Sequence, residues 1–357
     1  MKIAIHGFGR IGRSTTRVAL SQGLFVPVSI SDIQDPSTLA ELFAVDSNYG
    51  LWPEPVAFED GHFLIGNRKI PYINTAKSIP DWDSLDVDLV VDCTGRATTR
   101  AGAQAHLDRG AERVLVSANS KSVQDCDAVL LPGINLDSYN PAEHRIISMA
   151  SCTTNALAPL VKVMRENYGI KMGFFSTVHA YTATQALTDQ PMRDRRDSWA
   201  AAENIIPSGS GAAKGLKFIW PDLNITGKAY RVPVRTGSIV EMTVLVERAV
   251  SSEGVKDALR AAASSPQLKG IMGVLEKEYA SSRIVGESLS SIVDLPLTEV
   301  LGDSLISLAA WYDNEMGYST RLAEVAATLG GRSLESSHLV AGLTAETHIE
   351  DYSYGTL

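Results

Sequence analysis

The chain has 357 residues, 45% of them apolar and 20% charged, with a formal net charge of −9. This composition predicts about two globular domains and excludes disordered and collagen-like classes. The acidic balance argues against nucleic acid or an anionic membrane as partner, and no apolar run is long enough for a transmembrane helix. Three cysteines (Cys93, Cys126 and Cys152) are too few for a disulfide framework, so we expect a cytoplasmic protein.

Short buried strands alternate with helical patterns in the first 150 residues. This alternation is typical of βαβ units, and it predicts a parallel sheet with helices on both faces. The expected strands are 2–5, 26–31, 89–92, 114–117 and 146–149, and the expected helices include 11–21 and 98–109. We therefore predict a first domain of the α/β class over residues 1–150.

Longer, alternating strands follow residue 150 and indicate a second, α+β domain over 151–316 with a mostly antiparallel sheet. A polar loop as long as 183–211 is usually functional or part of an interface. A C-terminal helix within 317–332, ended by Gly330 and Gly331, is expected to return to the first domain, and 333–357 form a polar tail. The expected elements are a helix at 156–167, strands at 173–179, 225–232, 238–246 and 301–311, and a helix at 318–329.

A glycine-rich loop directly follows the first strand. Gly7, Gly9 and Gly12 form the pattern G-x-G-x-x-G, which permits a tight turn and close approach of the backbone to a pyrophosphate. The following helix N-terminus presents free N–H groups to the phosphates. Asp32 lies twenty residues further on, at the end of the second strand, where a carboxylate accepts hydrogen bonds from a ribose diol. The pattern predicts a dinucleotide site that favours NAD over NADP, because Asp32 repels a 2′-phosphate.

Cys152 is expected at a strand-to-helix junction, where the helix dipole and free N–H groups stabilise a thiolate. The alternative is a small buried filler, the usual fate of a lone cysteine. His179 ends an apolar strand, and it is either an acid–base partner for that thiol or a histidine satisfied at the sheet rim. His6, beside the glycine loop, is more simply a polar turn residue than a cofactor contact.

Read together, these residues resemble the D-glyceraldehyde-3-phosphate dehydrogenase family over roughly residues 1–330. The matching strings are GFGRIGR (7–13), DS (46–47), CTG (93–95), GIN (133–135), ASCTTN (150–155), VHAYTATQ (178–185), NIIP (204–207), GAAK (211–214), RVP (231–233) and WYDNEMGYS (311–319). ASCTTN and WYDNE are highly specific.

The resemblance implies an NAD-dependent enzyme of glycolysis and gluconeogenesis that forms a thioester on Cys152, with His179 raising the thiolate fraction and acting as acid and base. It also implies a homotetramer, in which the loop 183–211 reaches a neighbouring subunit. No metal is expected. The implied cofactor residues are Gly7, Gly9, Arg10, Ile11, Gly12, Asp32, Thr94, Gly95, Ser117 and Asn314; the implied residues for the aldehyde phosphate are Thr182, Thr184 and Arg231, and those for inorganic phosphate are Ser151, Thr153, Ser210 and Gly211.

Four positions depart from the family pattern. Trp199 stands where an arginine of the inorganic-phosphate site is usual, and Arg195, Arg196 or Arg235 is a candidate replacement. His6 and Ser31 replace residues at the cofactor rim, and Ala156 removes a second cysteine that could pair with oxidised Cys152.

The departures leave two alternatives open. The similar erythrose-4-phosphate dehydrogenase family hydrolyses its thioester and needs no strong phosphate-acceptor site; Trp199 and the stretch 143–148 favour it. Asp32 and the pair Thr182 and Thr184 favour glyceraldehyde 3-phosphate. A binding protein without turnover is a remote alternative, because Cys152, His179 and Arg231 are all retained.

Overall fold

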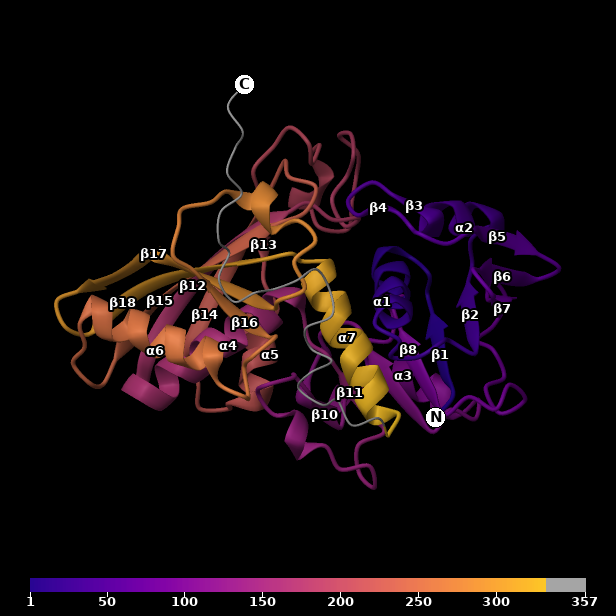
Figure 1. Cartoon of the computed structure of the whole chain (residues 1–357), viewed down its shortest axis with the longest axis horizontal. Helices are drawn as coiled ribbons and strands as arrows, with labels where there is room; N and C mark the ends of the chain where they lie inside the picture. The colour runs from indigo at the N-terminus through magenta and orange to yellow at the C-terminus, as the bar shows by residue number, and fades with distance from the viewer. Residues whose placement is uncertain (332–357) are drawn as a thin grey trace.

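The computed structural model describes residues 1–331, so the predicted tail at 333–357 lies outside the described residues. Figure 1 shows two sheets on opposite sides of helix α7 (Met316–Leu329). One sheet has nine strands and the other seven. Within residues 1–331, no helix combines the length and apolar character that crossing a lipid bilayer requires.

The nine-stranded sheet has the order β10-β11-β9-β8-β1-β2-β7-β6-β5. It is parallel from β10 to β7, as predicted, but β5 and β6 add an antiparallel edge that the prediction lacked. Asp60, Gly61 and Gly66 have positive φ and form the tight hairpin turns there. The strands are β1 (Ile3–His6), β2 (Ser29–Asp32), β5 (Val56–Glu59), β6 (His62–Ile65), β7 (Arg68–Asn74), β8 (Leu89–Asp92), β9 (Arg113–Val116), β10 (Ala128–Val129) and β11 (Ile146–Ser148).

Helices cover both faces of this sheet, as expected. Ile3 and Ile5 of β1 share a buried cluster with residues of α7, whereas Ala4 points to the other face, toward Trp82. The predicted strand 26–31 starts only at Ser29, and Val26 is exposed. The other elements of this part are α1 (Arg10–Ser21), α2 (Pro36–Ala44), α3 (Arg100–Leu107) and the small pair β3 (Val45–Asp46) and β4 (Gly50–Leu51).

The seven-stranded sheet has the order β13-β14-β12-β15-β18-β17-β16. It is mostly antiparallel, as predicted, and the pairs β12–β14 and β16–β17 are parallel. The predicted strand 301–311 is β18, but its start was placed too early: Leu301 ends β17, and Gly302 with positive φ turns the chain into β18, which begins at Leu305. The strands are β12 (Ile170–Ala180), β13 (Ile206–Gly209), β14 (Ile225–Val232), β15 (Ser238–Val246), β16 (Met272–Leu275), β17 (Ser291–Leu301) and β18 (Leu305–Tyr312).

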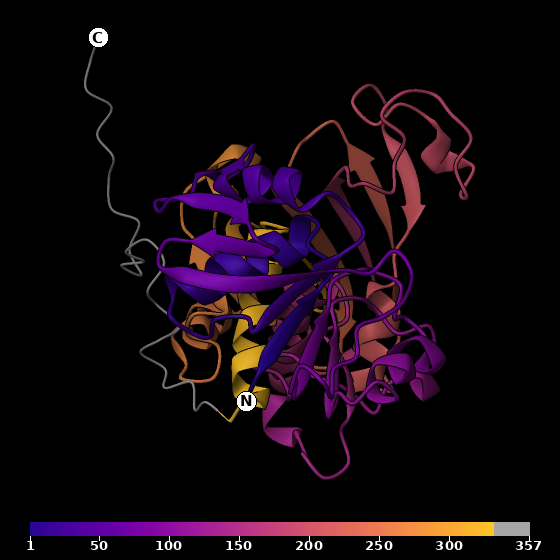
Figure 2. The same cartoon turned by 90° about the vertical axis from the view of Figure 1, so that its right-hand side faces the viewer.

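One face of this sheet is covered by α4 (Cys152–Tyr168), α5 (Ala212–Ile219) and α6 (Ser252–Ser264) (Figure 1). Neither α5 nor α6 was predicted. Helix α4 begins at Cys152, four residues before the predicted start, because Ser151 and Thr154 form a capping box. The loop 183–211 contains β13 as well as irregular structure, and Figure 2 shows this segment projecting from the body of the molecule.

Candidate active site

The glycine loop runs from the end of β1 into α1 and has no room for side chains at two of its glycines. Gly7 has φ +90°, and a Cβ there would lie 2.8 Å from the Thr94 nitrogen. At Gly12 a Cβ would lie 2.1 Å from the Gly7 carbonyl oxygen. A Cβ at Gly9 would meet nothing within 4 Å, so this position faces open space. The loop thus has the close packing and the open backbone edge that a pyrophosphate needs.

These residues fit a bound dinucleotide. Gly9 caps α1 without a side-chain hydrogen bond, and the first N–H groups of a helix, here those of Arg10 and Ile11, have no intrahelical acceptor. Asp32 Oδ2 accepts a hydrogen bond from Phe8 N at 2.6 Å, and Oδ1 accepts from the backbone beyond β2. The carboxylate is therefore fixed beside the loop and retains acceptor positions for a ribose diol.

The remaining cofactor candidates lie at the carboxyl ends of strands of both sheets. Thr94 and Gly95 follow β8, Ser117 follows β9, and Asn314 follows β18. Asn314 is 5% exposed, and its Oδ1 accepts a hydrogen bond from Ser238 Oγ at 2.9 Å. That bond leaves the amide Nδ2, which has no partner among residues 1–331, as a donor of fixed direction.

A strained turn presents Cys152. Ala150 has φ +53°, an uncommon conformation for a residue with a side chain, and it is buried. Its carbonyl accepts a hydrogen bond from Tyr318 of α7, and its N–H donates to Ser148. Strain of this kind persists only where the surrounding structure enforces it. The turn places the sulfur at the first residue of α4, where the N–H groups of Cys152 and Thr153 favour a thiolate.

Cys152 and His179 meet although they lie on different elements. The distance from Cys152 Sγ to His179 Nε2 is 3.4 Å, and Cys152 is partly exposed whereas His179 is 3% exposed. Asn314 reaches the same place, because Ser238 Oγ also accepts a hydrogen bond from Ala180 N, next to His179. Asn314 and the cysteine–histidine pair therefore form one site.

The protonation states differ from those that the resemblance implies. Burial raises the pKa of the Cys152 thiol, although the nearby Arg231 charge works in the opposite direction. Burial, together with Arg231, lowers the pKa of His179 to about 3. At neutral pH the pair is therefore a thiol beside a neutral imidazole rather than a thiolate–imidazolium ion pair. The neutral imidazole suits His179 as a base for the thiol proton.

Tyr312 and Thr177 lie behind the cysteine–histidine pair, and the sequence patterns did not point to a role for either of them. Tyr312 OH lies 3.0 Å from Thr153 Oγ1 and 2.8 Å from Thr177 Oγ1, and its ring meets the His179 ring edge to face. Tyr312 belongs to the string WYDNE, so its place in a specific motif was the available signal.

The phosphate candidates form two groups. Arg231 lies opposite His179 in the β12–β14 pairing, with one guanidinium nitrogen 2.5 Å from His179 Nδ1. Its Nε is buried without a partner among residues 1–331, so it is an unsatisfied donor. Thr182 and Thr184 pair through their hydroxyl groups at 2.9 Å just beyond β12.

The second group lies at two helix N-termini that pack together. Ser151 caps α4, and Ser210 and Gly211 precede α5. The hydroxyl of Ser151 already bonds Thr154, and that of Thr153 is held by Tyr312. The site roles of all these residues stay predictions.

The structure does not bring Arg235 to this group, because its guanidinium donates to the carbonyl of Ser47 at 3.0 Å. Trp199 is 56% exposed and follows a short 3-10 turn that contains Arg196.

His6, Asp92 and His106 are the one group within residues 1–331 whose spacing could hold a metal ion. Trp82 Nε1 donates to His106 Nδ1 at 3.1 Å, so His106 carries its proton on Nε2 and donates it to Asp92. That nitrogen is therefore not free to bind a metal. Burial lowers the pKa of His6 to about 4, and its Nδ1 bonds Ser31. The cluster is buried at the end of β1, where His6 directly precedes the glycine loop.

A Rossmann crevice that ends at a cysteine–histidine pair defines a nicotinamide-dependent dehydrogenase. The family models described as "Glyceraldehyde 3-phosphate dehydrogenase, NAD binding domain" and "C-terminal domain" match residues 1–100 and 151–314. The chain belongs to the glyceraldehyde-3-phosphate dehydrogenase family.

Curated relatives carry the name of this family. The chain is 45% identical to the glyceraldehyde-3-phosphate dehydrogenase of Kitasatospora aureofaciens over 93% of its own length and 99% of the relative. It is 39% identical to that of Geobacillus stearothermophilus, with coverages of 94% and 99%. For the Chlamydia pneumoniae protein the identity is 40%, with coverages of 91% and 97%.

Proposed function

We propose that the protein oxidises D-glyceraldehyde 3-phosphate to an acyl phosphate, with Cys152 as nucleophile and His179 as acid and base. The observation that carries this proposal is the 3.4 Å contact between Cys152 Sγ and His179 Nε2 at the end of the dinucleotide crevice. We also propose that the NAD-binding domain ends at residue 150 and that the catalytic domain ends at residue 316. NAD, when bound along the glycine loop and Asp32, supplies the hydride acceptor.

The residues of the chain act on the aldehyde in sequence. His179 Nε2 takes the thiol proton while Sγ bonds to the aldehyde carbon, and the N–H groups at the start of α4 stabilise the resulting oxyanion. His179 then returns this proton to the oxyanion, which becomes the hydroxyl group of the hemithioacetal. As the carbon of the adduct loses a hydride to the acceptor that NAD would supply, His179 takes the hydroxyl proton back, and a thioester is left on Cys152. An oxygen of inorganic phosphate then attacks the thioester carbonyl, the carbon–sulfur bond breaks, and the acyl phosphate leaves.

Two observations support a phosphorylated substrate. The unpartnered Nε of Arg231 and the hydroxyl pair of Thr182 and Thr184 provide a cation and donors beside the reacting sulfur. Ser151, Ser210 and Gly211 lie at helix N-termini, which favour anions, and they suit the incoming phosphate.

The test compares two aldehydes with and without inorganic phosphate. We expect NADH formation from glyceraldehyde 3-phosphate to depend on phosphate, and that from erythrose 4-phosphate to be slower. Phosphate-independent turnover that is faster with erythrose 4-phosphate would overturn the proposal in favour of thioester hydrolysis. Reactions without NAD control for chemical decay of the aldehydes.

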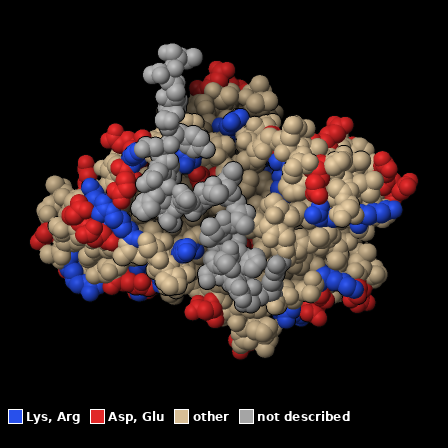
Figure 3. All heavy atoms as spheres, in the orientation of Figure 1, with Lys and Arg blue, Asp and Glu red and all other residues tan. Residues whose placement is uncertain are grey.

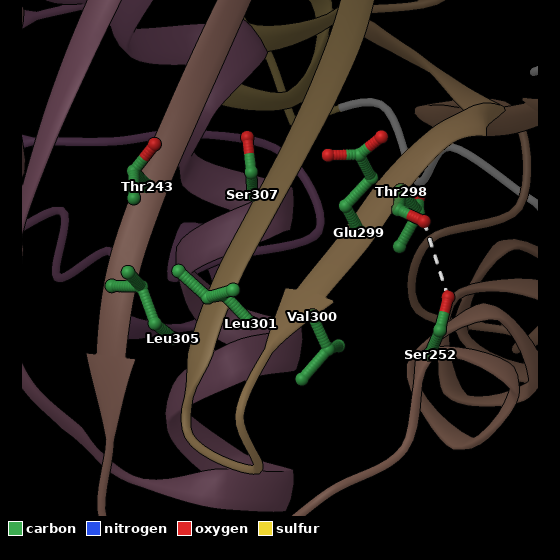
Figure 4. A pocket seen from close by; sticks show the side chains of 8 residues that line it. All are labelled: Thr243, Ser252, Thr298, Glu299, Val300, Leu301, Leu305 and Ser307. Carbon is green, nitrogen blue, oxygen red and sulfur yellow. Dashed lines mark hydrogen bonds between the residues drawn. The ribbon is translucent and has the colours of Figure 1, made fainter.

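We further propose that the protein is a homotetramer that acts in the cytoplasm. The face of the seven-stranded sheet opposite α4 carries exposed apolar side chains, with Phe174 66%, Val178 43% and Leu301 74% exposed. Figure 4 shows Thr243, Ser307 and Glu299 on this face, on the adjacent strands β15, β18 and β17. An exposed apolar sheet face suits a second copy of the chain.

Other features support the same assignment. The three cysteines are unpaired, as in a reducing compartment. On the face shown in Figure 3, Lys and Arg are interspersed with Asp and Glu, a pattern unlike the single-sign surface of a nucleic-acid-binding protein.

Sedimentation measurements test the assembly. We expect the mass of four chains for the wild type and a smaller species for Phe174→Glu, because the new charge would be desolvated in the interface. Lys171→Glu, an exposed change three positions earlier on β12, is the matched control. A wild-type monomer at micromolar concentration contradicts the tetramer.

A further inference from the structure

Five side chains tie the start of α1 to the segment that carries Asn314. The flanking cluster consists of Arg10, Asp46, Tyr49, Asp313 and Glu315. The first three belong to the part of the chain with the nine-stranded sheet, and the last two flank Asn314 between β18 and α7. The flanking cluster therefore spans the crevice in which the dinucleotide is proposed to bind.

Arg10 forms the charged half of this cluster. Its guanidinium pairs with Asp46 Oδ2 at 2.5 Å and with both carboxylate oxygens of Glu315. Burial opposes the charge of Arg10, but the bonds to Glu315 and Asp46 hold its pKa above the ordinary value. Both partners of the Arg10 guanidinium are carboxylates of the protein itself. Arg10 therefore presents its backbone N–H group, rather than its charge, to the dinucleotide.

Tyr49 forms the other half. Its OH donates to Asp313 Oδ1 at 2.8 Å, and the carboxylate of Asp313 also accepts from Thr236 Oγ1 and Gly286 N, each at 2.8 Å. Burial raises the pKa of Tyr49, so the phenol remains a donor across the working pH range. Asp313 is 1% exposed, and breaking one of these bonds leaves a buried carboxylate under-satisfied.

Thr236 belongs to this half and lies next to Asn314. Its hydroxyl lies 2.8 Å from Asp313 Oδ1 and 3.4 Å from Asn314 Oδ1, and its one proton goes to the nearer carboxylate. Ser238 is then the donor to Asn314 Oδ1. Asp313 and Glu315 flank Asn314 in the chain. Their bonds to Tyr49 and Arg10 fix the backbone on either side of this residue.

We propose that Tyr49, Arg10 and Glu315 are positioning residues that set the Asn314 amide against the nicotinamide end of the bound dinucleotide. This inference rests on the proposed function, which assigns Asn314 to the nicotinamide carboxamide. The flanking cluster does this by fixing Glu315 to Arg10, at the helix start that faces the pyrophosphate, and Asp313 to Tyr49. The protein groups that contact the pyrophosphate and those that contact the nicotinamide end are thereby held in a fixed position relative to each other.

The experiment measures equilibrium binding of NAD and of ADP-ribose, which lacks the nicotinamide ring. We expect Tyr49→Phe to weaken NAD binding by at least about fivefold and to change ADP-ribose binding by less than about twofold, since one charge-assisted hydrogen bond is lost on the nicotinamide side only. Glu315→Gln should change the two affinities in the same pattern. Tyr168→Phe, which loses a comparable bond to the Gly254 carbonyl at the far end of α4, is the matched control and should change neither.

A double-mutant cycle with Asn314→Ala completes the test. If the flanking cluster acts through Asn314, then Tyr49→Phe has no further effect on NAD affinity in that background. Equal weakening of NAD and ADP-ribose, or an effect that persists in Asn314→Ala, overturns the inference. If Asn314→Ala itself leaves the ratio of the two affinities unchanged, the role of Asn314 in the proposed function fails instead. Thermal melting of each variant verifies that it is folded.

Discussion

Replacing Cys152 by serine is expected to lower kcat/KM for the phosphorylated aldehyde by at least about 10⁴-fold, the scale seen when a covalent nucleophile is removed. A serine hydroxyl in the same place is far less acidic than a thiol, and the neutral His179 at 3.4 Å is too weak a base to ionise it fully. Steady-state NADH formation measures the loss, and mass spectrometry after acid quenching detects the acyl group on the wild-type enzyme but not on the variant.

NAD affinity is the control for this variant. The glycine loop and Asp32 do not contact the sulfur through any hydrogen bond of the described residues, so binding of NAD should remain within about twofold of the wild-type value. Cys126→Ser, a change at a buried cysteine of the sheet region, should leave the acyl-enzyme intact. Retention of turnover by Cys152→Ser would falsify the thioester mechanism.

Replacing His179 by glutamine is expected to lower kcat/KM by about 10²–10⁴-fold, the usual contribution of a positioned acid–base group. The amide can still donate a hydrogen bond toward sulfur, but it cannot take the thiol proton. Because NAD does not touch the thiol proton, the loss should fall on turnover rather than on cofactor affinity.

The pH dependence of thiol alkylation separates a neutral pair from an ion pair. The pKa of the thiol is raised, so the thiolate fraction is small at neutral pH and grows as the pH rises toward and beyond the pKa of the thiol. The pKa of His179 is about 3, so no titration of the imidazole is expected between about pH 5 and 8. Rates of inactivation by iodoacetamide should therefore increase in a single step above neutral pH. A second step near the ordinary histidine pKa that disappears in His179→Gln would show an imidazolium–thiolate pair and contradict this assignment.

Patterns of local geometry could be recognised in the sequence before the fold was known. The glycines at 7, 9 and 12 mark a turn with positive φ and close backbone contacts, and Gly7 has both. Asp32 was predicted beside that loop, and Phe8 N donates to its carboxylate. The start of α4 at Cys152 was only half predicted, because apolar periodicity suggested residue 156 and the capping box at Ser151 decided otherwise.

Features that depend on distant segments escaped local patterns. The antiparallel edge β5–β6 and the start of β18 at Leu305 rather than at residue 301 depend on strand pairing, which a short window of sequence does not contain. Tyr312 lies in a recognised motif, but its place behind His179 depends on the pairing of three neighbouring strands in one sheet.

The sequence alone determined the kinds of chemical group present and their local backbone: the dinucleotide loop, its acidic partner, and a cysteine at a helix start. The tertiary structure decided that Cys152 and His179 are in contact and that burial favours the neutral form of both. It also decided that Tyr49 and Arg10 hydrogen-bond to the neighbours of Asn314. The physical reason is that turn geometry and helix capping are local, whereas a pKa and a distance between remote side chains depend on which surfaces are packed together and removed from water.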